Sequence, residues 1–270
     1  MQSQCPIGVF DSGVGGLTVW QELRHQLPQE SIVYFGDTAR VPYGDRSPSE
    51  IRGFVRQILQ WLETKSIKMA IAACNTSSAL AIDLLREEFN FPILGIILPG
   101  ARAAVRKGKK VGVIATTATV HSETYVKAMA EIDPHVQVWQ VACPEFVPLI
   151  EAGRIDDPYT FKTAEAYLEP LVRADIDTLV LGCTHYPHLQ HIFQQILPPY
   201  VQYIDPAEYL VRAAAQELDL MGLKNNSGQQ PRLEFWVSGN PRQFAQVSRR
   251  WLGTEYRVGK VSFSTVKLLS

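Results

Sequence analysis

Two short segments place a cysteine where it could act on a substrate: Ala73-Cys74-Asn75-Thr76 and Gly182-Cys183-Thr184-His185. Each cysteine follows an apolar run, at 69–73 or 178–181, that is short, aliphatic and typical of a buried parallel strand. The carboxyl ends of such strands open into the crevice where α/β proteins bind ligands. Forming a thiolate at pH 7 costs only about 2 kcal/mol, so thiols can serve as bases and, once protonated, as acids. Two matched thiols therefore predict an acid and a base that face one substrate.

The alternative for either cysteine taken singly is a small buried hydrophobic residue, which is what most free cysteines are. Their shared position at strand ends, each before a polar pair, favours the catalytic interpretation. His185 follows Cys183 closely enough to donate to a substrate or to modulate the thiol. His188 and His191 follow along the next helix, and we expect them at the surface. A zinc site would show paired ligands such as C-x-x-C, which the sequence lacks, so we expect no metal.

Asp11 lies where another apolar run, 7–10, enters the glycine-rich turn Ser12-Gly13-Val14-Gly15-Gly16. A carboxylate there could hold a substrate ammonium group or orient a thiol; the alternative is an Asx turn or a helix cap. The turn does not spell G-x-G-x-x-G, and Asp11 would repel a pyrophosphate, so we do not expect a bound dinucleotide. We expect the glycines to expose backbone amides to a smaller carboxylate group. Glu151, read alone, is a helix carboxylate with no special chemistry.

Strand-like and helix-like segments alternate along almost the whole chain, which predicts an α/β fold with parallel sheets covered by helices on both faces. The sequence predicts these strands and helices in the first half: strands 7–10, 32–35, 69–73 and 93–97, and helices 17–26, 49–64 and 77–88. The pattern restarts at Val111-Gly112-Val113-Ile114, which resembles Ile7-Gly8-Val9-Phe10. The offset between these runs is similar to that between the two cysteines, which indicates two related halves.

We therefore predict two pseudo-symmetric domains that pack face to face, with the active site in the cleft between them. The first comprises residues 1–98 plus 207–270, and the second comprises residues 99–206. The polar, Gly/Asn/Gln-rich stretch 222–231 predicts a loop, and the segments from Leu233 onward are expected to return to the first domain.

Composition narrows the class of protein. A net charge of -1 over 270 residues shows no excess of basic residues that would attract nucleic acid or an anionic membrane, and we expect neither partner. The basic run 106–110 is typical of a solvated loop before a strand. No apolar stretch approaches the ~20 residues of a spanning helix, and residues 1–6 do not resemble a signal peptide. The sequence holds 4 cysteines and no sign of a disulfide framework, so we expect a cytoplasmic protein with reduced thiols.

Taken together, four segments resemble the bacterial glutamate racemases: residues 9–16, 41–44, 73–76 and 181–187, in that order along the chain. The resemblance covers essentially the whole chain. It implies a cofactor-independent amino-acid racemase of the aspartate/glutamate racemase superfamily, with two α/β domains and the site between them. It also implies a role in supplying D-glutamate for peptidoglycan, the cell-wall polymer, and a homodimeric assembly.

The resemblance also assigns residues. It implies that Cys74 and Cys183 are the two catalytic acid/bases and that Asp11, His185 and Glu151 assist them. It places substrate binding at Asp11, Ser12, Pro42, Tyr43, Gly44, Asn75, Thr76, Thr119, Thr184 and His185.

This assignment suits the chemistry of racemisation. Two bases on opposite faces of a substrate can remove the Cα proton and return another without turning the substrate over. Without pyridoxal phosphate, the carbanion must be stabilised by donors around the α-carboxylate, for which Asn75, Thr76 and Thr184 are suited. Two alternatives stay open: a racemase of the same superfamily that acts on aspartate or a hydantoin, and a catalytically silent amino-acid-binding module. The presence of both cysteines weighs against the silent module.

Overall fold

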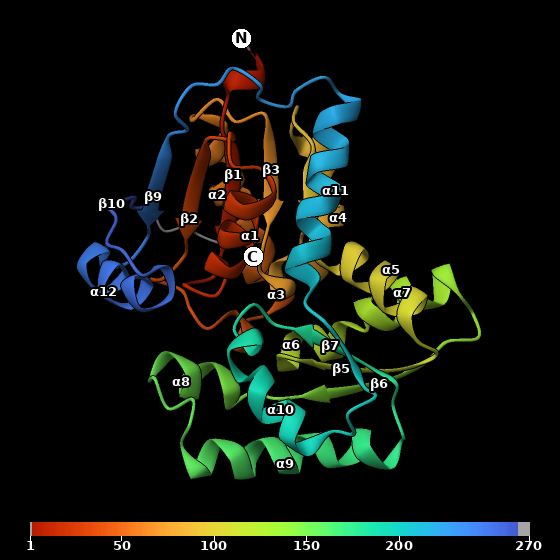
Figure 1. The fold of residues 1–270 in the computed structure, drawn as a ribbon. Helices are drawn as coiled ribbons and strands as arrows, with labels where there is room; N and C mark the ends of the chain where they lie inside the picture. The colour runs from red at the N-terminus through yellow and green to blue at the C-terminus, as the bar shows by residue number, and fades with distance from the viewer. Residues whose placement is uncertain (1, 264–270) are drawn as a thin grey trace.

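The structure, a computed structural model, describes residues 2–263 and contains two parallel sheets, each covered by helices on both faces (Figure 1). The first sheet has the strand order β10-β9-β2-β1-β3-β4, and the second has the order β6-β5-β7-β8. The prediction of an α/β fold made of two parallel-sheet halves is confirmed. The strands are β1 (Ile7–Asp11), β2 (Ile32–Gly36), β3 (Met69–Ala72), β4 (Ile93–Gly95), β5 (Lys110–Ala115), β6 (Gln137–Ala142), β7 (Thr178–Gly182), β8 (Gln202–Ile204), β9 (Leu233–Val237) and β10 (Val258–Lys260).

Helices enclose each sheet because neighbouring strand residues point to opposite faces and both faces are apolar. In the first sheet, Ile7 and Val9 face a core shared with α1, α11 and α12, whereas Phe10 faces a core shared with α2 and α4. In the second sheet, one face packs on α8, α9 and α10 and the other on α5 and α7. The helices are α1 (Leu17–Gln26), α2 (Pro48–Glu63), α3 (Asn75–Leu80), α4 (Ile82–Leu85), α5 (Ile97–Lys107), α6 (Thr117–Ser122), α7 (Thr124–Ile132), α8 (Phe146–Glu151), α9 (Pro158–Arg173), α10 (Gln190–Ile196), α11 (Pro206–Leu220) and α12 (Pro241–Leu252).

The two halves share the same order of strands. The core of the first sheet, β2-β1-β3-β4, has the same order as β6-β5-β7-β8 when each half is numbered from its own first strand. In this order the chain leaves the first strand toward one edge of the sheet and returns on its other side. The crevice between the first and third strands is therefore a topological switch point, where ligands bind in open α/β sheets. The sequences that follow β1, β3, β5 and β7 are thus expected to form the site.

Local signals explain why several helices begin where they do. Ser47 caps α2, since its side chain accepts a hydrogen bond from the Glu50 backbone while the Glu50 carboxylate accepts one from the Ser47 backbone. Pro48 occupies the first turn, where its missing N–H group costs nothing. The side chains of Asp157, Asp205 and Asn240 cap α9, α11 and α12 by accepting hydrogen bonds from backbone N–H groups of the first turn, and each precedes a proline.

Several predicted boundaries differ from the structure. The helix expected at 77–88 begins at Asn75 and breaks at Ala81, where φ is -130° and the chain starts a new short helix. The strand expected at 93–97 ends at Gly95, because α5 begins at Ile97. The predicted division between residues 98 and 99 thus falls within the first turn of α5, where Pro99 is tolerated because the N–H groups of that turn have no intrahelical partner.

The segment from Leu233 onward lies in the first sheet, because β9 pairs with β2 and β10 pairs with β9. The limits of the two domains, 1–98 plus 207–270 and 99–206, stay a prediction. Residues 1 and 264–270, which that prediction assigns to the first domain, lie outside the described residues. Among the helices of residues 2–263, none is long and apolar enough to cross a membrane.

Candidate active site

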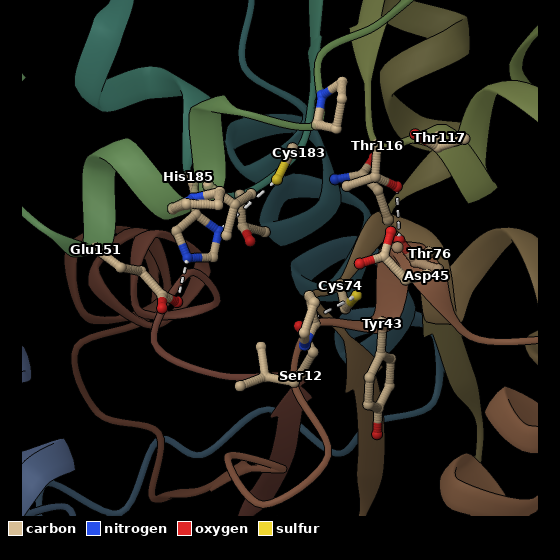
Figure 2. A pocket seen from close by; sticks show the side chains of 18 residues that line it. Ser12, Tyr43, Asp45, Cys74, Thr76, Thr116, Thr117, Glu151, Cys183 and His185 are labelled. Carbon is tan, nitrogen blue, oxygen red and sulfur yellow. Dashed lines mark hydrogen bonds and ion pairs between the residues drawn. The ribbon is translucent and has the colours of Figure 1, made fainter. Parts of the chain in front are cut away.

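A cavity of about 240 Å³ lies between the two sheets, at the carboxyl ends of their strands (Figure 2). Its volume is below the ~300–1,000 Å³ typical of drug-sized ligands, which suits a ligand as small as an amino acid. The residues of the sequence-predicted site that line it are Ser12, Pro42, Tyr43, Gly44, Cys74, Asn75, Thr76, Glu151, Cys183, Thr184 and His185. Asp11 and Thr119 lie behind its wall.

The two cysteines lie on facing walls of this cavity, one from each half of the molecule (Figure 2). Cys74 follows β3 and precedes the first residue of α3, and its Sγ donates to Ser12 Oγ at 3.9 Å. Cys183 follows β7 in the matching position of the second sheet. Burial, together with the negative charge of Asp11, raises the pKa of the Cys74 thiol to about 11. Cys74 is therefore a protonated thiol in this arrangement at neutral pH.

Cys183 has a cationic neighbour instead. His185 Nδ1 lies 3.7 Å from Cys183 Sγ, and His185 Nε2 lies 3.1 Å from Glu151 Oε1. Burial by itself lowers the pKa of His185, but the contacts with Cys183 and Glu151 outweigh it and raise the pKa to about 10. The imidazole is then charged at neutral pH and donates from both nitrogens. The site is electrostatically asymmetric, with a carboxylate beside one cysteine and an imidazolium beside the other.

Asp11 makes the Asx turn that was the structural alternative for this residue, since Gly13 N donates to its Oδ1 at 2.8 Å. Its other oxygen accepts from Thr184 Oγ1 at 3.4 Å, across the interface between the halves. Burial raises the pKa of Asp11, and the nearby His185 charge opposes that rise. Asp11 thus connects the first-half turn to the segment that carries Cys183, and a direct contact with substrate stays a prediction.

The glycine-rich turn has a different role from the expected one. Gly13, Val14, Gly15 and Gly16 do not line the cavity, so their amides do not face a ligand there. Instead the glycines permit close packing: a Cβ on Gly15 would lie 2.3 Å from Thr184 Oγ1 and 2.5 Å from His185 Nδ1. The second half approaches the first so closely here that no larger side chain fits.

Three threonine hydroxyls form a cluster at another part of the wall. Thr76 Oγ1 lies 3.0 Å from Thr116 Oγ1 and 3.3 Å from Thr119 Oγ1, and the latter two are 3.0 Å apart. Thr119 is fully buried and reaches the cavity only through the other two hydroxyls. Thr76 and Thr116 line the cavity and Thr119 does not, so the direct substrate contact expected of Thr119 stays a prediction.

Tyr43 contributes to the wall without offering its hydroxyl. Its ring points away from the cavity in Figure 2, and its Oη donates to Asp37 Oδ2. Asp37 is fully buried and also accepts from Ser238 Oγ at 2.6 Å and from Arg40 Nη1 at 3.3 Å. This network fixes residues 41–45, so Pro42, Tyr43 and Gly44 line the cavity as a held loop.

His188 was expected at the surface and is instead partly buried. Its ring packs on Trp251 of α12 with centroids 4.2 Å apart, while the same indole meets the edge of His185 at 5.6 Å. Burial and the nearby His185 charge lower the pKa of His188 to about 4. His191 is exposed, as expected, and lies 2.9 Å from Asp156 Oδ1. The error for His188 arose because Trp251 comes from the far end of the chain.

Sequence reasoning missed part of the cavity wall. The unpredicted residues are Val41, Asp45, Thr116, Thr117, Pro144, Val147 and Pro148. Thr116 and Thr117 could have been found, because they follow β5, the strand that corresponds to β1, and so stand at a switch point. Pro144 and the α8 residues carry no comparable signal. Within residues 2–263, no group of three or more His, Cys, Asp or Glu side chains is arranged to hold a metal ion.

Comparison with known proteins places this geometry in a family. The Asp/Glu/Hydantoin racemase family model matches residues 7–214. A glutamate racemase from Nostoc sp. is 59% identical over 263 residues, which cover 97% of this chain and 90% of that protein. The crystal structure of a glutamate racemase isoform from Bacillus anthracis superimposes with a TM-score of 0.92 at 38% identity, over 97% of this chain and 98% of that one.

A glutamate racemase from Francisella tularensis, solved in complex with D-glutamate, has a TM-score of 0.90 at 36% identity, again over 97% of this chain and 98% of that one. Identity and coverage at this level extend across both sheets and both cysteine segments. The chain therefore belongs to the Asp/Glu/Hydantoin racemase family, among its glutamate racemases.

Proposed function

We propose that the protein interconverts L-glutamate and D-glutamate with Cys74 and Cys183 as its two acid/base groups and without a cofactor. The observation that carries this proposal is the placement of two thiols on facing walls of one small cavity. Glutamate is favoured as substrate because similar proteins are glutamate racemases, one of them solved in complex with D-glutamate.

The proposed reaction needs one sulfur on each face of the substrate Cα. One cysteine, as thiolate, takes the Cα proton, and the electron pair of the broken C–H bond moves into the α-carboxylate. The other cysteine, as thiol, then gives its proton to the opposite face, so the thiol and thiolate exchange positions. The reverse reaction starts from the exchanged state.

The charges around the two cysteines support a starting state for one direction. Cys74 holds its proton because of burial and Asp11, and it can act as the acid. His185 Nδ1 lies 3.7 Å from Cys183 Sγ, so an imidazolium there can balance the negative charge of a thiolate, the form in which Cys183 would remove the Cα proton. Glu151 holds the imidazole in place from its other side. Asp11, His185 and Glu151 are therefore proposed to assist the two cysteines rather than to touch Cα.

Negative charge that develops on the carboxylate needs donors already in position. Asn75, Thr76 and Thr184 line the cavity on the elements that carry the cysteines. Their polar side chains can hold a carboxylate in place while Cα lies between the sulfurs. Ser12 and the loop 42–44 are proposed to complete the substrate site.

We further propose that the product D-glutamate serves peptidoglycan synthesis in the cytoplasm and that the chain forms a homodimer. Both proposals rest on the resemblance to glutamate racemases. Analytical ultracentrifugation of the purified chain tests the dimer, and depletion of the protein in its host, with and without added D-glutamate, tests the role in the cell wall.

The reaction itself is tested with L-glutamate in D2O, using protein purified without added cofactor and under reducing conditions. Optical rotation and the α-proton NMR signal are followed together. We expect both to decay, because each turnover exchanges the α-proton for deuterium while it scrambles the configuration. No change in either would refute the proposal for glutamate. A parallel incubation with L-aspartate tests the alternative substrate, and binding without exchange would indicate a silent binding module.

A further inference from the structure

Asn75 is held from behind by a tyrosine of the other half. Tyr125, on α7 of the second half, donates from Oη to Asn75 Oδ1 at 2.7 Å. Tyr125 is fully buried and Asn75 is 3% exposed. Tyr125 belongs to the core that α5 and α7 share with the second sheet, whereas Asn75 opens α3 after the third strand of the first sheet. The hydrogen bond therefore joins the two halves directly beside Cys74.

The same contact leaves the other end of the amide free. Asn75 Nδ2 is buried and has no hydrogen-bond partner among the described residues, although Asn75 lines the cavity. A buried donor without a partner costs about 1–3 kcal/mol. An unpaired buried donor in a native structure calls for an explanation, and for Asn75 a ligand acceptor in the adjoining cavity supplies one. An NH2 group at the wall of a cavity that takes an amino acid is suited to a carboxylate oxygen.

Orientation is the property that Tyr125 can control. An asparagine amide can turn about its last bond, which exchanges its acceptor oxygen and its donor NH2 group. In the turned state a carbonyl oxygen would face the substrate carboxylate, and the two would repel each other. Burial, followed by the negative charges of Asp205 and Cys183, raises the pKa of Tyr125 well above its ordinary value. Its hydroxyl therefore stays a donor across the working pH range.

We propose that Tyr125 is a positioning residue that locks the Asn75 amide with its NH2 group toward the cavity, where it donates to a carboxylate oxygen of the substrate. This inference rests on the proposed function, because it takes an amino-acid carboxylate as the acceptor. Since the bond crosses from α7 to α3, it also makes the donor's orientation depend on the two halves being packed together.

The first test substitutes the hydroxyl alone. Tyr125→Phe should lower kcat/KM for glutamate by about 2- to 10-fold, the loss expected for one orienting hydrogen bond. Tyr203→Phe is the matched control, since the Tyr203 hydroxyl is buried without a partner among the described residues and lies outside the cavity wall. Thermal unfolding of both variants shows whether the fold survives.

A double-mutant cycle then asks whether Tyr125 acts through Asn75. Asn75→Ala removes the amide, so adding Tyr125→Phe to it should cause no further loss of kcat/KM. An equal loss in both backgrounds would mean that Tyr125 supports the site independently of Asn75, and the inference would be wrong. Unchanged activity in Tyr125→Phe would overturn it as well.

A spectroscopic readout separates failure of this inference from failure of the proposed function. In protein labelled with 15N-asparagine, the Asn75 side-chain signal is identified by its absence in Asn75→Ala. Tyr125→Phe should shift this signal in the ligand-free protein and reduce its response to D-glutamate. If the unmodified protein does not racemise glutamate, the proposed function fails, and the ligand-free signal still decides: an unmoved signal shows that Tyr125 does not hold Asn75.

Discussion

Replacing Gly15 with alanine tests whether close contact between the halves sets the geometry of the site. The added Cβ would lie 2.3 Å from Thr184 Oγ1 and 2.5 and 2.6 Å from His185 Nδ1 and Cε1. Ordinary van der Waals contact begins at 3.4 Å, so Thr184, His185 or the turn must move by about 1 Å. Both neighbours belong to the cavity wall beside Cys183, so the displacement acts on the reacting geometry directly.

The size of the expected effect follows from that displacement. A misplacement of about 1 Å costs roughly 100-fold in rate when reacting groups must be aligned. We therefore expect kcat/KM of Gly15→Ala to fall by about 100-fold in both directions of the reaction. Overpacking should also lower the free energy of unfolding by about 1–3 kcal/mol. The assay is initial-rate circular dichroism with L- and D-glutamate, with urea denaturation to measure stability.

Gly53→Ala is the matched control, because a Cβ at Gly53 of α2 meets nothing within 4 Å. This control should keep full activity, and its unfolding free energy should rise by about 0.5–1 kcal/mol from the better helix propensity of alanine. A folded Gly15→Ala protein with unchanged kcat/KM would refute the reasoning, since it would show that Thr184 and His185 can shift by this distance without consequence.

Four other substitutions are predicted to have measurable effects. Cys74→Ser and Cys183→Ser should each lower the rate of racemisation by about 10²–10⁴-fold while the fold stays intact. Cys5→Ser, at a cysteine outside the cavity, is the control and should keep the full rate. A fully active Cys74→Ser or Cys183→Ser variant would contradict the two-base assignment. Glu151→Gln removes a contact that raises the pKa of His185, so the alkaline limb of the pH profile of kcat/KM should move to lower pH by about one unit. The shift is small because Glu151 is partly exposed to solvent. An unmoved alkaline limb would show that Glu151 does not control the ionisation of His185. Lys68 Nζ lies 2.5 Å from Glu30 Oε2, and both side chains are buried. Lys68→Met leaves the Glu30 carboxylate buried without its ion pair, so the unfolding free energy measured in urea should fall by about 3–5 kcal/mol while the activity per folded molecule stays unchanged. A loss below about 1 kcal/mol would indicate that water reaches Glu30.

The sequence by itself determined the elements and the positions of the cysteines. Aliphatic runs of strand length that alternate with amphipathic helices specify parallel sheets, because a strand covered on both faces must be apolar throughout. The capping box at Ser47 and Glu50 places the start of α2 within one residue of the prediction, since its chemistry is local. The positions of Cys74 and Cys183 at strand ends are equally local, so their approach to one crevice followed from topology.

Only the tertiary structure decided what surrounds those cysteines. Trp251 packs on His188, Tyr125 donates a hydrogen bond to Asn75, and the missing side chain of Gly15 leaves room for Thr184. In each case the two partners belong to different halves of the molecule. Such contacts depend on how two sheets dock, which the period of a single strand or helix does not encode. Packing also sets the ionisation of the site. The adjacent Cys183 and the distant Glu151 raise the pKa of His185 to about 10 against the effect of burial, and burial with the charge of Asp11 raises the pKa of Cys74 to about 11. The sequence determines which functional group each residue carries, but packing between the halves determines its charge and its orientation.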